Sequence, residues 1–307
     1  MSKFISIDNI LYAIDPKAYL NKSERNIQRV NNRLDEYLKA PNEEHIHDIR
    51  TAIRRLRASY QSLPKAIRNE KKMNEFVAKS KELFSINSKI RDYDIIFGML
   101  SKYVPVEHLP KPGQQLQFSQ TSTNLFKLLK TVRNRKLSEA KSIALDLRKL
   151  NLPKLGGKMS NKSESKLEKR FNNVVCKLAN TIERNYPVVL SSPKRISELH
   201  EMRKDCKQLR YLLELLPIGE NGKNKDEDKV SQAIEELAKV QDMLGTIHDC
   251  DTTIAYLKNH HKDRPVHGVI EHLYKDRQKK FEQFAEYCKV DLSDSNDNLF
   301  LNIMNIS

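Results

Sequence analysis

The sequence predicts an all-α protein made of two matched halves with four helices each. Its 8 glycines and 11 prolines among 307 residues are about half of the ~12% typical of globular proteins, which is too few turn formers for a fold of many short strands. Apolar residues recur with the 3.6-residue helical period along eight stretches. A basic motif also occurs twice, 153 residues apart, as expected of an internal duplication.

The first half contains the predicted helices 18–39, 43–63, 67–100 and 122–149. Pro41 ends the first of them, and Asn42 is placed to cap the second, whose first turn carries two acidic residues. We expect a break in the third near Asn87. The loop 101–121, which holds three prolines and a glycine, separates the third helix from the fourth. Residues 1–150 therefore form the first predicted half.

The second half contains the predicted helices 163–186, 194–216, 227–258 and 264–289. One proline and two glycines mark residues 151–162 as a linker between the halves. Pro193 opens the helix 194–216, since proline is favoured in a first turn, and Pro217 ends it. The second half thus spans 163–290, and a C-terminal tail, 291–307, follows it.

The duplication is visible in two pairs of motifs. Residues 47–57 read HDIRTAIRRLR and residues 200–210 read HEMRKDCKQLR, both of the form H-x-x-R-x-x-x-[RK]-x-x-R. The matched pairs are His47/His200, Arg50/Arg203, Arg54/Lys207 and Arg57/Arg210. Downstream, IRDYD at 90–94 matches IHDCD at 247–251, in the same order and at an offset of 157.

Each basic motif forms a stripe beside the buried face of its helix. At 100° per residue the four positions fall within an arc of about 80°, and the stripe is about 15 Å long. The apolar Ile49, Ile53 and Leu56 occupy the neighbouring arc, as do Met202 and Cys206 in the second copy. Like charges at these spacings destabilise a helix. Two such stripes therefore predict an anionic partner; the alternative is a solvated basic face, with arginine side chains lying over the core.

The overall charge indicates the same class of partner. Lys and Arg number 55 against 40 Asp and Glu, a net charge of +15. A surplus of this size suggests nucleic acid, an anionic membrane or a phosphate polymer. Composition alone does not choose among the three.

With these motifs the chain resembles the CHAD domain family, whose name stands for conserved histidine α-helical domain. The resemblance rests on HDIRTAIRRLRASY, IRDYDI, LHEMRKDCKQLRYLLELL and LAKVQDMLGTIHDCD, in that order, and covers about residues 20–290. It implies two pseudo-symmetric four-helix bundles around a basic central channel, binding of inorganic polyphosphate, and association with polyphosphate granules. The polyphosphate-binding residues that it implies are His47, Arg50, Arg54, Arg57, His200, Arg203, Lys207 and Arg210. One departure is His248, because the family usually has arginine there, as at Arg91 in the first half.

Basic residues on the flanking helices are secondary candidates for the channel walls, although a single basic residue of this kind is more often solvated than functional. They are Arg29, Arg33, Arg133, Lys136, Lys166, Arg170, Arg277 and Lys280. The aspartate pairs Asp92/Asp94 and Asp249/Asp251 could suggest a metal site. The two members of each pair lie about 200° apart on a helix, so we expect them instead to hold basic residues of the adjacent motif helix.

No metal, cofactor or membrane span is predicted. The four cysteines include no CxxC pair and fit free, buried thiols in a reducing cytosol. The N-terminus lacks the pattern of a signal peptide, and no apolar run of ~18 residues is present. We therefore expect a cytoplasmic protein.

The resulting functional hypothesis is non-catalytic binding of polyphosphate through arginine, lysine and histidine. A nucleic-acid-binding helical protein is the first alternative, but it should carry aromatic or base-reading side chains among its cations. A metal-dependent phosphohydrolase is the second, but the sequence lacks a P-loop, a nucleophile elbow and the ExExK motif of triphosphate-tunnel enzymes. The sequence thus favours a binding module.

Overall fold

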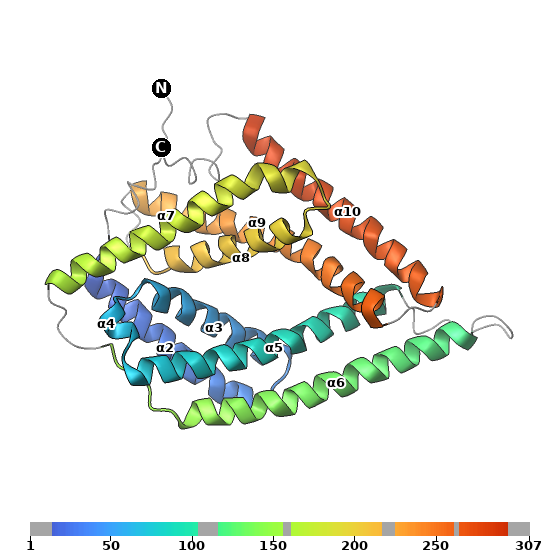
Figure 1. Ribbon diagram of the computed structural model, residues 1–307, viewed down its shortest axis with the longest axis horizontal. Helices are drawn as coiled ribbons and strands as arrows, with labels where there is room; N and C mark the ends of the chain where they lie inside the picture. Colours follow the sequence, from blue (N-terminus) through green and yellow to red (C-terminus); the bar gives the residue numbers. More distant parts are fainter. Residues whose placement is uncertain (1–13, 104–115, 156–160, 217–224, 261–263, 294–307) are drawn as a thin grey trace.

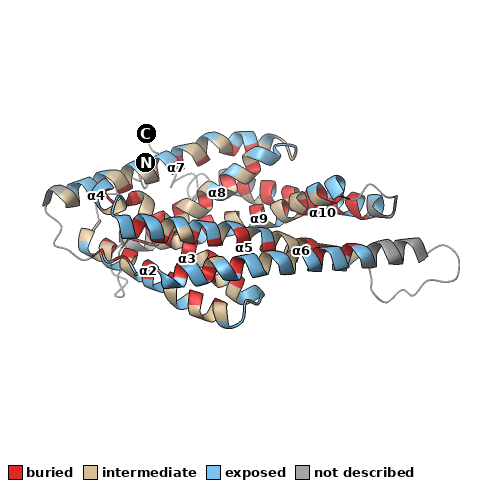
Figure 2. Cartoon of the chain, turned by 60° about the horizontal axis from the view of Figure 1, so that its bottom comes forward, coloured by how far each residue is buried: buried red, intermediate tan, exposed pale blue. Residues whose placement is uncertain are grey.

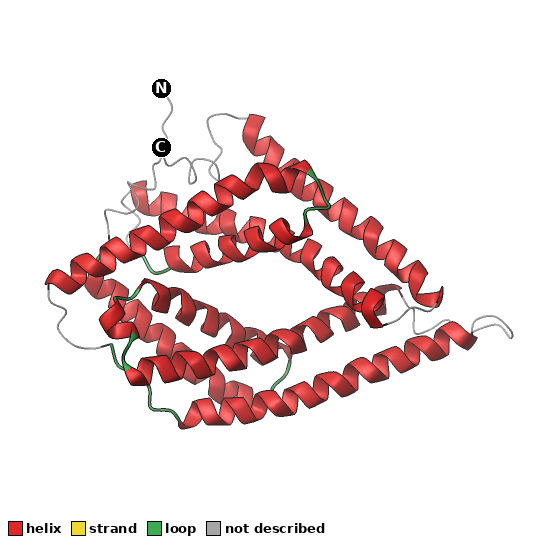
Figure 3. Ribbon diagram, viewed as in Figure 1, coloured by secondary structure: helices red, strands yellow, loops and turns green. Residues whose placement is uncertain are grey.

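The computed structural model describes residues 14–103, 116–155, 161–216, 225–260 and 264–293 of the chain. Every regular element in these residues is a helix and none is a strand (Figure 3). The helices are α2 (Pro16–Lys39), α3 (Glu43–Ser62), α4 (Lys65–Arg68), α5 (Lys71–Tyr103), α6 (Leu116–Lys149), α7 (Asn161–Ser191), α8 (Ile196–Leu213), α9 (Lys225–His260) and α10 (Arg264–Ser293). The predicted all-α class is confirmed.

The first half follows the predicted helices with three differences. The helices α5 and α6 extend into the predicted loop 101–121, to Tyr103 and from Leu116. Asn42 caps α3 as expected, because its Oδ1 accepts a hydrogen bond from the backbone N–H of His45 at 2.8 Å. A separate short helix, α4, precedes α5. The expected break near Asn87 is absent, and α5 runs on unbroken. The Oδ1 atom of the buried Asn87 accepts a hydrogen bond from the Tyr37 hydroxyl at 3.0 Å, a tertiary contact that satisfies this oxygen inside the helix, whereas the Nδ2 atom is buried without a partner.

The second half differs from the prediction at two prolines, Pro187 and Pro193. The helix α7 continues through Pro187 to Ser191, although proline removes one backbone hydrogen bond. The fully buried Val189 in this last turn compensates by packing in the core. The helix α8 begins at Ile196, so Pro193 lies in the preceding turn and not in the first helical turn as predicted. Pro217, residues 104–115 and the tail from residue 294 lie outside the described residues.

The two halves use their helices in the same order. In each half the successive long helices pack against one another, α2–α3–α5–α6 in the first and α7–α8–α9–α10 in the second. Across the halves, α3 packs against α8 and α5 against α9 (Figure 1). The helices that carry the two pairs of similar motifs therefore meet in the middle of the molecule.

A continuous apolar core joins the halves. The larger core cluster includes Tyr19, Leu34 and Phe76 of the first half together with Phe171 and Leu212 of the second. Figure 2 shows these buried faces turned inward and the exposed faces turned outward. A smaller cluster joins the C-terminal part of α5 and the N-terminal part of α6 to the C-terminal part of α9 and the N-terminal part of α10. Among the described residues, no helix combines the length and the apolar character needed to cross a membrane.

Candidate anion-binding site

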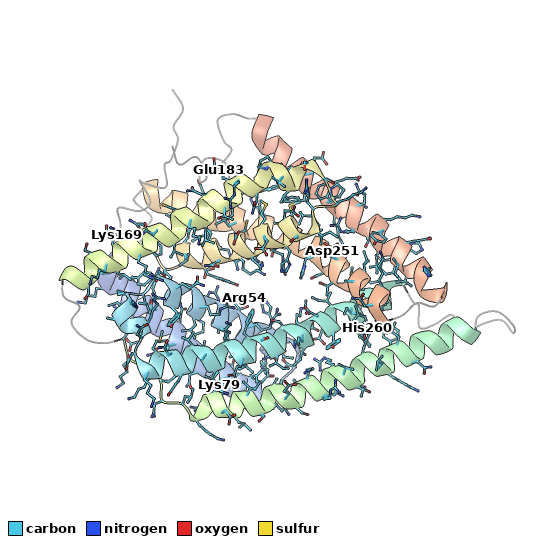
Figure 4. The ribbon with its side chains drawn as sticks, in the orientation of Figure 1. Arg54, Lys79, Lys169, Glu183, Asp251 and His260 are labelled. Atoms are coloured by element: carbon cyan, nitrogen blue, oxygen red, sulfur yellow. The ribbon has the colours of Figure 1, made fainter. Side chains whose placement is uncertain are left out.

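The basic stripes of α3 and α8 face a common cavity of about 720 Å³, whose other walls are α5 and α9. The predicted residues that line it are His47, Arg50, Arg54, His200, Arg203, Lys207 and Arg210. The eighth, Arg57, lines an adjoining cavity of about 230 Å³, which shares Arg54, Arg203 and Lys207 with the first. In Figure 4, Arg54 lies at the central opening between the halves.

The position of the stripes follows from the helical pattern. On α3, the fully buried Ile46, Ile49 and Ile53 face the core, and the cations occupy the adjacent arc. The same relation holds on α8, where Met202 and Cys206 are fully buried. A side chain beside the buried arc points along the seam with the neighbouring helix. The two seams meet because α3 packs on α8.

An aromatic ring organises the first stripe. The guanidinium carbons of Arg50, Arg54 and Arg57 lie 5.8, 5.2 and 5.5 Å from the centre of the Phe84 ring, within cation–π range. Sequence reasoning missed Phe84. It lies seven residues before Arg91, on the cavity-facing side of α5, and this helical spacing from the second motif was the available signal.

A second aromatic ring, that of Tyr211, lies against the guanidinium groups of Arg55 and Arg210. Its ring centre lies 5.4 Å from the guanidinium of Arg55 and 4.8 Å from that of Arg210. Arg55 also donates to a carboxylate oxygen of Glu214 at 2.7 Å. Neither Tyr211 nor Arg55 was among the residues predicted from the sequence, although each directly follows a motif position.

Three arginines of the site each have a buried nitrogen without a hydrogen-bond partner. The Nε atoms of Arg50, Arg203 and Arg210 are buried without a partner. Burial and the neighbouring Arg54 lower the pKa of Arg50 to about 9. Burial, followed by Arg54 and Arg203, lowers the pKa of Lys207 to about 6. Such shifts arise when cations are crowded together and desolvated.

Acidic residues offset only part of this charge. Seven Arg and Lys side chains line the larger cavity against three aspartates, Asp92, Asp242 and Asp249. Burial raises the pKa of Asp92 and Asp249, although the facing Arg50 and Arg203 lower them again. The arrangement can therefore accept several anionic oxygens at once.

A model of the CHAD domain family matches residues 24–258 of the chain. The chain belongs to the CHAD domain family. Among solved structures, the crystal structure of the CHAD domain from the plant Ricinus communis resembles it with a TM-score of 0.54 and 13% identity, covering 100% of this chain and 94% of that one. At this identity the likeness supports the fold alone. A search of curated proteins returned no match.

The secondary candidates of this CHAD domain lie outside the two cavities. Most are occupied by carboxylates: Arg33 by Glu36 and Asp48, Arg133 by Asp94, Lys136 by Glu139, Arg277 by Asp251 and Lys280 by Asp276. Arg29 is exposed on α2. Lys166 and Arg170 line a separate groove along α7.

The two members of each aspartate pair point in different directions, one toward the central cavity and the other toward an outer helix. Asp92 and Asp249 line the central cavity and act electrostatically on Arg50 and Arg203 of the motif helices, but they do not form the predicted ion pairs with them. The prediction was wrong for Asp94 and Asp251, which pair with Arg133 of α6 and Arg277 of α10. The reason is the ~200° separation within each D-x-D, which turns the second carboxylate toward the outer helix.

The histidines of the CHAD motif differ between the halves. His47 keeps 64% of its side chain exposed. His200 is half-buried, and its Nδ1 lies 3.1 Å from Nδ1 of His248. Burial and Arg203 lower the pKa of His248 to about 3, so it is neutral near pH 7. Within the described part of the chain, no three His, Cys, Asp or Glu side chains gather as a metal site would require.

Lys207 gives the unliganded protein a measurable pH dependence. Its pKa falls from 10.5 to about 6 on folding, so between these values the unfolded chain binds one more proton. The free energy of unfolding should then fall as the pH is lowered from 9 toward 6, by up to about 1.4 kcal/mol per pH unit. Urea unfolding of wild type and Lys207→Met at several pH values tests this. The variant should lose that slope, and identical slopes would contradict the assigned pKa.

Proposed function

We propose that this CHAD domain binds inorganic polyphosphate in the cavity between α3 and α8, without catalysing its breakdown. The observation that carries the proposal is the set of buried arginines from both halves whose Nε atoms have no acceptor. Leaving a buried donor unsatisfied costs free energy. A phosphate chain would supply acceptors and negative charge to both halves together.

The chemistry of the cavity suits a linear phosphate polymer. Guanidinium groups bind phosphate oxygens through two parallel hydrogen bonds. Lys207 acts as a point charge once the phosphate chain is bound, because the nearby negative charge raises its pKa again. Phe84 lies against three of the guanidiniums, which restricts their orientations in the free protein and lowers the entropy lost on binding. In a cell that contains polyphosphate granules, this activity would bring the protein to them from the cytoplasm.

Nucleic acid fits the same cavity less well. Base stacking needs a free aromatic face. The rings that line the cavity, Phe84 and Tyr211, already face guanidinium groups. The proposal for binding without catalysis rests on the missing enzyme motifs of the sequence.

A competition experiment tests the proposal. Labelled polyphosphate should be displaced by unlabelled polyphosphate at far lower phosphate concentration than by DNA or RNA, at both 50 and 200 mM salt. Affinity should fall steeply between the two salt conditions because binding releases counterions. The same protein, with and without Mg²⁺ or Mn²⁺, should release no orthophosphate. Equal displacement by nucleic acid, or metal-dependent orthophosphate release that Arg54→Ala abolishes, would refute the proposal.

A further inference from the structure

A second basic groove runs along α7. It has a volume of about 810 Å³ and lies between α7, α8 and the turn from α3 to α4. Its cations are Lys65, Lys166, Lys169, Arg170 and Lys177. Four of the five come from α7 at helical spacing, so they share one face and extend about 16 Å along the axis. Figure 4 places Lys169 on the outer part of α7, away from the central Arg54.

The groove keeps a positive surplus. Two acidic residues line it, Glu201 and Asp205. Glu201 is already paired with Lys204 at 2.5 Å, and burial raises the pKa of Asp205, which disfavours its charged form. In the described part of the chain, none of the five groove cations lies within 4.0 Å of a carboxylate. The groove thus contains cations that form no ion pair with a carboxylate of the described residues.

The groove adjoins the central cavities through an amide pair. Gln61 and Gln208 line both the α7 groove and the cavity that contains Arg54 and Lys207. The Gln208 side chain donates a hydrogen bond to the Gln61 side chain, and Arg170 Nε donates to the Gln61 backbone oxygen at 2.7 Å. Amide groups can donate to phosphate oxygens without adding charge. Cationic walls therefore continue on both sides of this neutral junction.

We propose that the α7 groove is a second anion-binding segment, which holds the part of a long polyphosphate chain that extends out of the central cavity past Gln61 and Gln208. This inference rests on the proposed function of the central cavity. It adds a consequence that the central cavity alone does not have: the contribution of α7 depends on chain length. A short chain fills the central cavity only, whereas a long chain contacts both segments.

The test compares two probes, tripolyphosphate and a polyphosphate of several hundred units. The variant Lys166→Ala/Lys169→Ala/Lys177→Ala should bind the long chain about ten-fold more weakly, with a salt slope reduced by up to about two units. Its affinity for tripolyphosphate should stay within about two-fold. The matched control, Lys71→Ala/Lys72→Ala/Lys81→Ala, removes the same charge from exposed positions on α5 that line none of these cavities.

The outcomes separate this inference from the proposed function. Equal losses of affinity in the two triple variants, or losses that do not depend on chain length, would refute the second binding segment on α7. Net charge alone would then explain the losses. Long-chain binding unaffected by the α7 changes would refute this segment too, while Arg54→Ala/Lys207→Ala could still weaken both probes. If that double variant weakens neither probe, the central proposal itself fails.

Discussion

Replacing Arg54 and Lys207 by alanine should lower the affinity for polyphosphate by about 100-fold at fixed salt. Both side chains line the two central cavities, and they come from opposite helices. Hydrogen bonds to charged groups contribute about 1.5–3 kcal/mol each. Losing two at the lower end of this range, about 3 kcal/mol in total, corresponds to slightly more than 100-fold. The salt slope should also fall, by up to about one unit per lost phosphate contact. Titration calorimetry at three salt concentrations measures both quantities.

The matched control is Arg25→Ala/Lys39→Ala, which removes one Arg and one Lys, the same formal charge, from exposed positions outside both cavities. It should reduce affinity only a few-fold, because exposed charges act at a distance and are screened by salt. The double variant at the site should remain folded, since it relieves repulsion between like charges; circular dichroism checks this. Equal losses in the two variants would show that the stripes are not a site.

Replacing Asp251 by alanine should lower the free energy of unfolding by about 3–5 kcal/mol. Asp251 and Arg277 form an ion pair whose side chains are only 13% and 7% exposed, with a second hydrogen bond of 3.3 Å between Nη2 and Oδ2. Removing one partner leaves a buried charge without compensation, which is the costly way to break such a pair. Urea denaturation measures the loss.

An exposed pair provides the control for that experiment. Arg148 Nε lies 2.6 Å from Asp35, but the two side chains are 47% and 43% exposed. Asp35→Ala should therefore cost about 1 kcal/mol or less. The double variant Asp251→Leu/Arg277→Met should recover most of the lost stability, because an apolar pair needs no counter-charge. A cost for Asp251→Ala no greater than that for Asp35→Ala would contradict the structural role assigned to this pair.

Helical periodicity predicted most of the fold because burial and the helical repeat act on neighbouring residues. Asn42 was recognised as a cap since capping involves only residues within one turn. The local signals failed at Asn87 and Pro187, where partners distant in sequence or core packing decided the outcome. The Tyr37 hydroxyl donates a hydrogen bond to the side-chain oxygen of Asn87, and the buried Val189 offsets the backbone hydrogen bond lost at Pro187.

The sequence by itself determined the all-α class, the repeated motifs, and the arc of the helix on which each basic stripe lies. These follow from the spacing of residues along one helix, which the 3.6-residue period converts directly into angles. The same geometry implies that the two aspartates of each D-x-D point in different directions. It does not identify the partners of Asp94 and Asp251.

Only the tertiary structure decided which helices face one another. It placed Phe84 against three arginines, turned Arg133 and Arg277 toward aspartates and away from the cavities, and set the α7 groove beside the pair Gln61–Gln208. The physical reason is that burial, desolvation and pairing of charge depend on atoms from different helices. The spacing of residues along one helix gives the direction in which each side chain points from the helix axis. It does not give the residues of other helices that the side chain contacts.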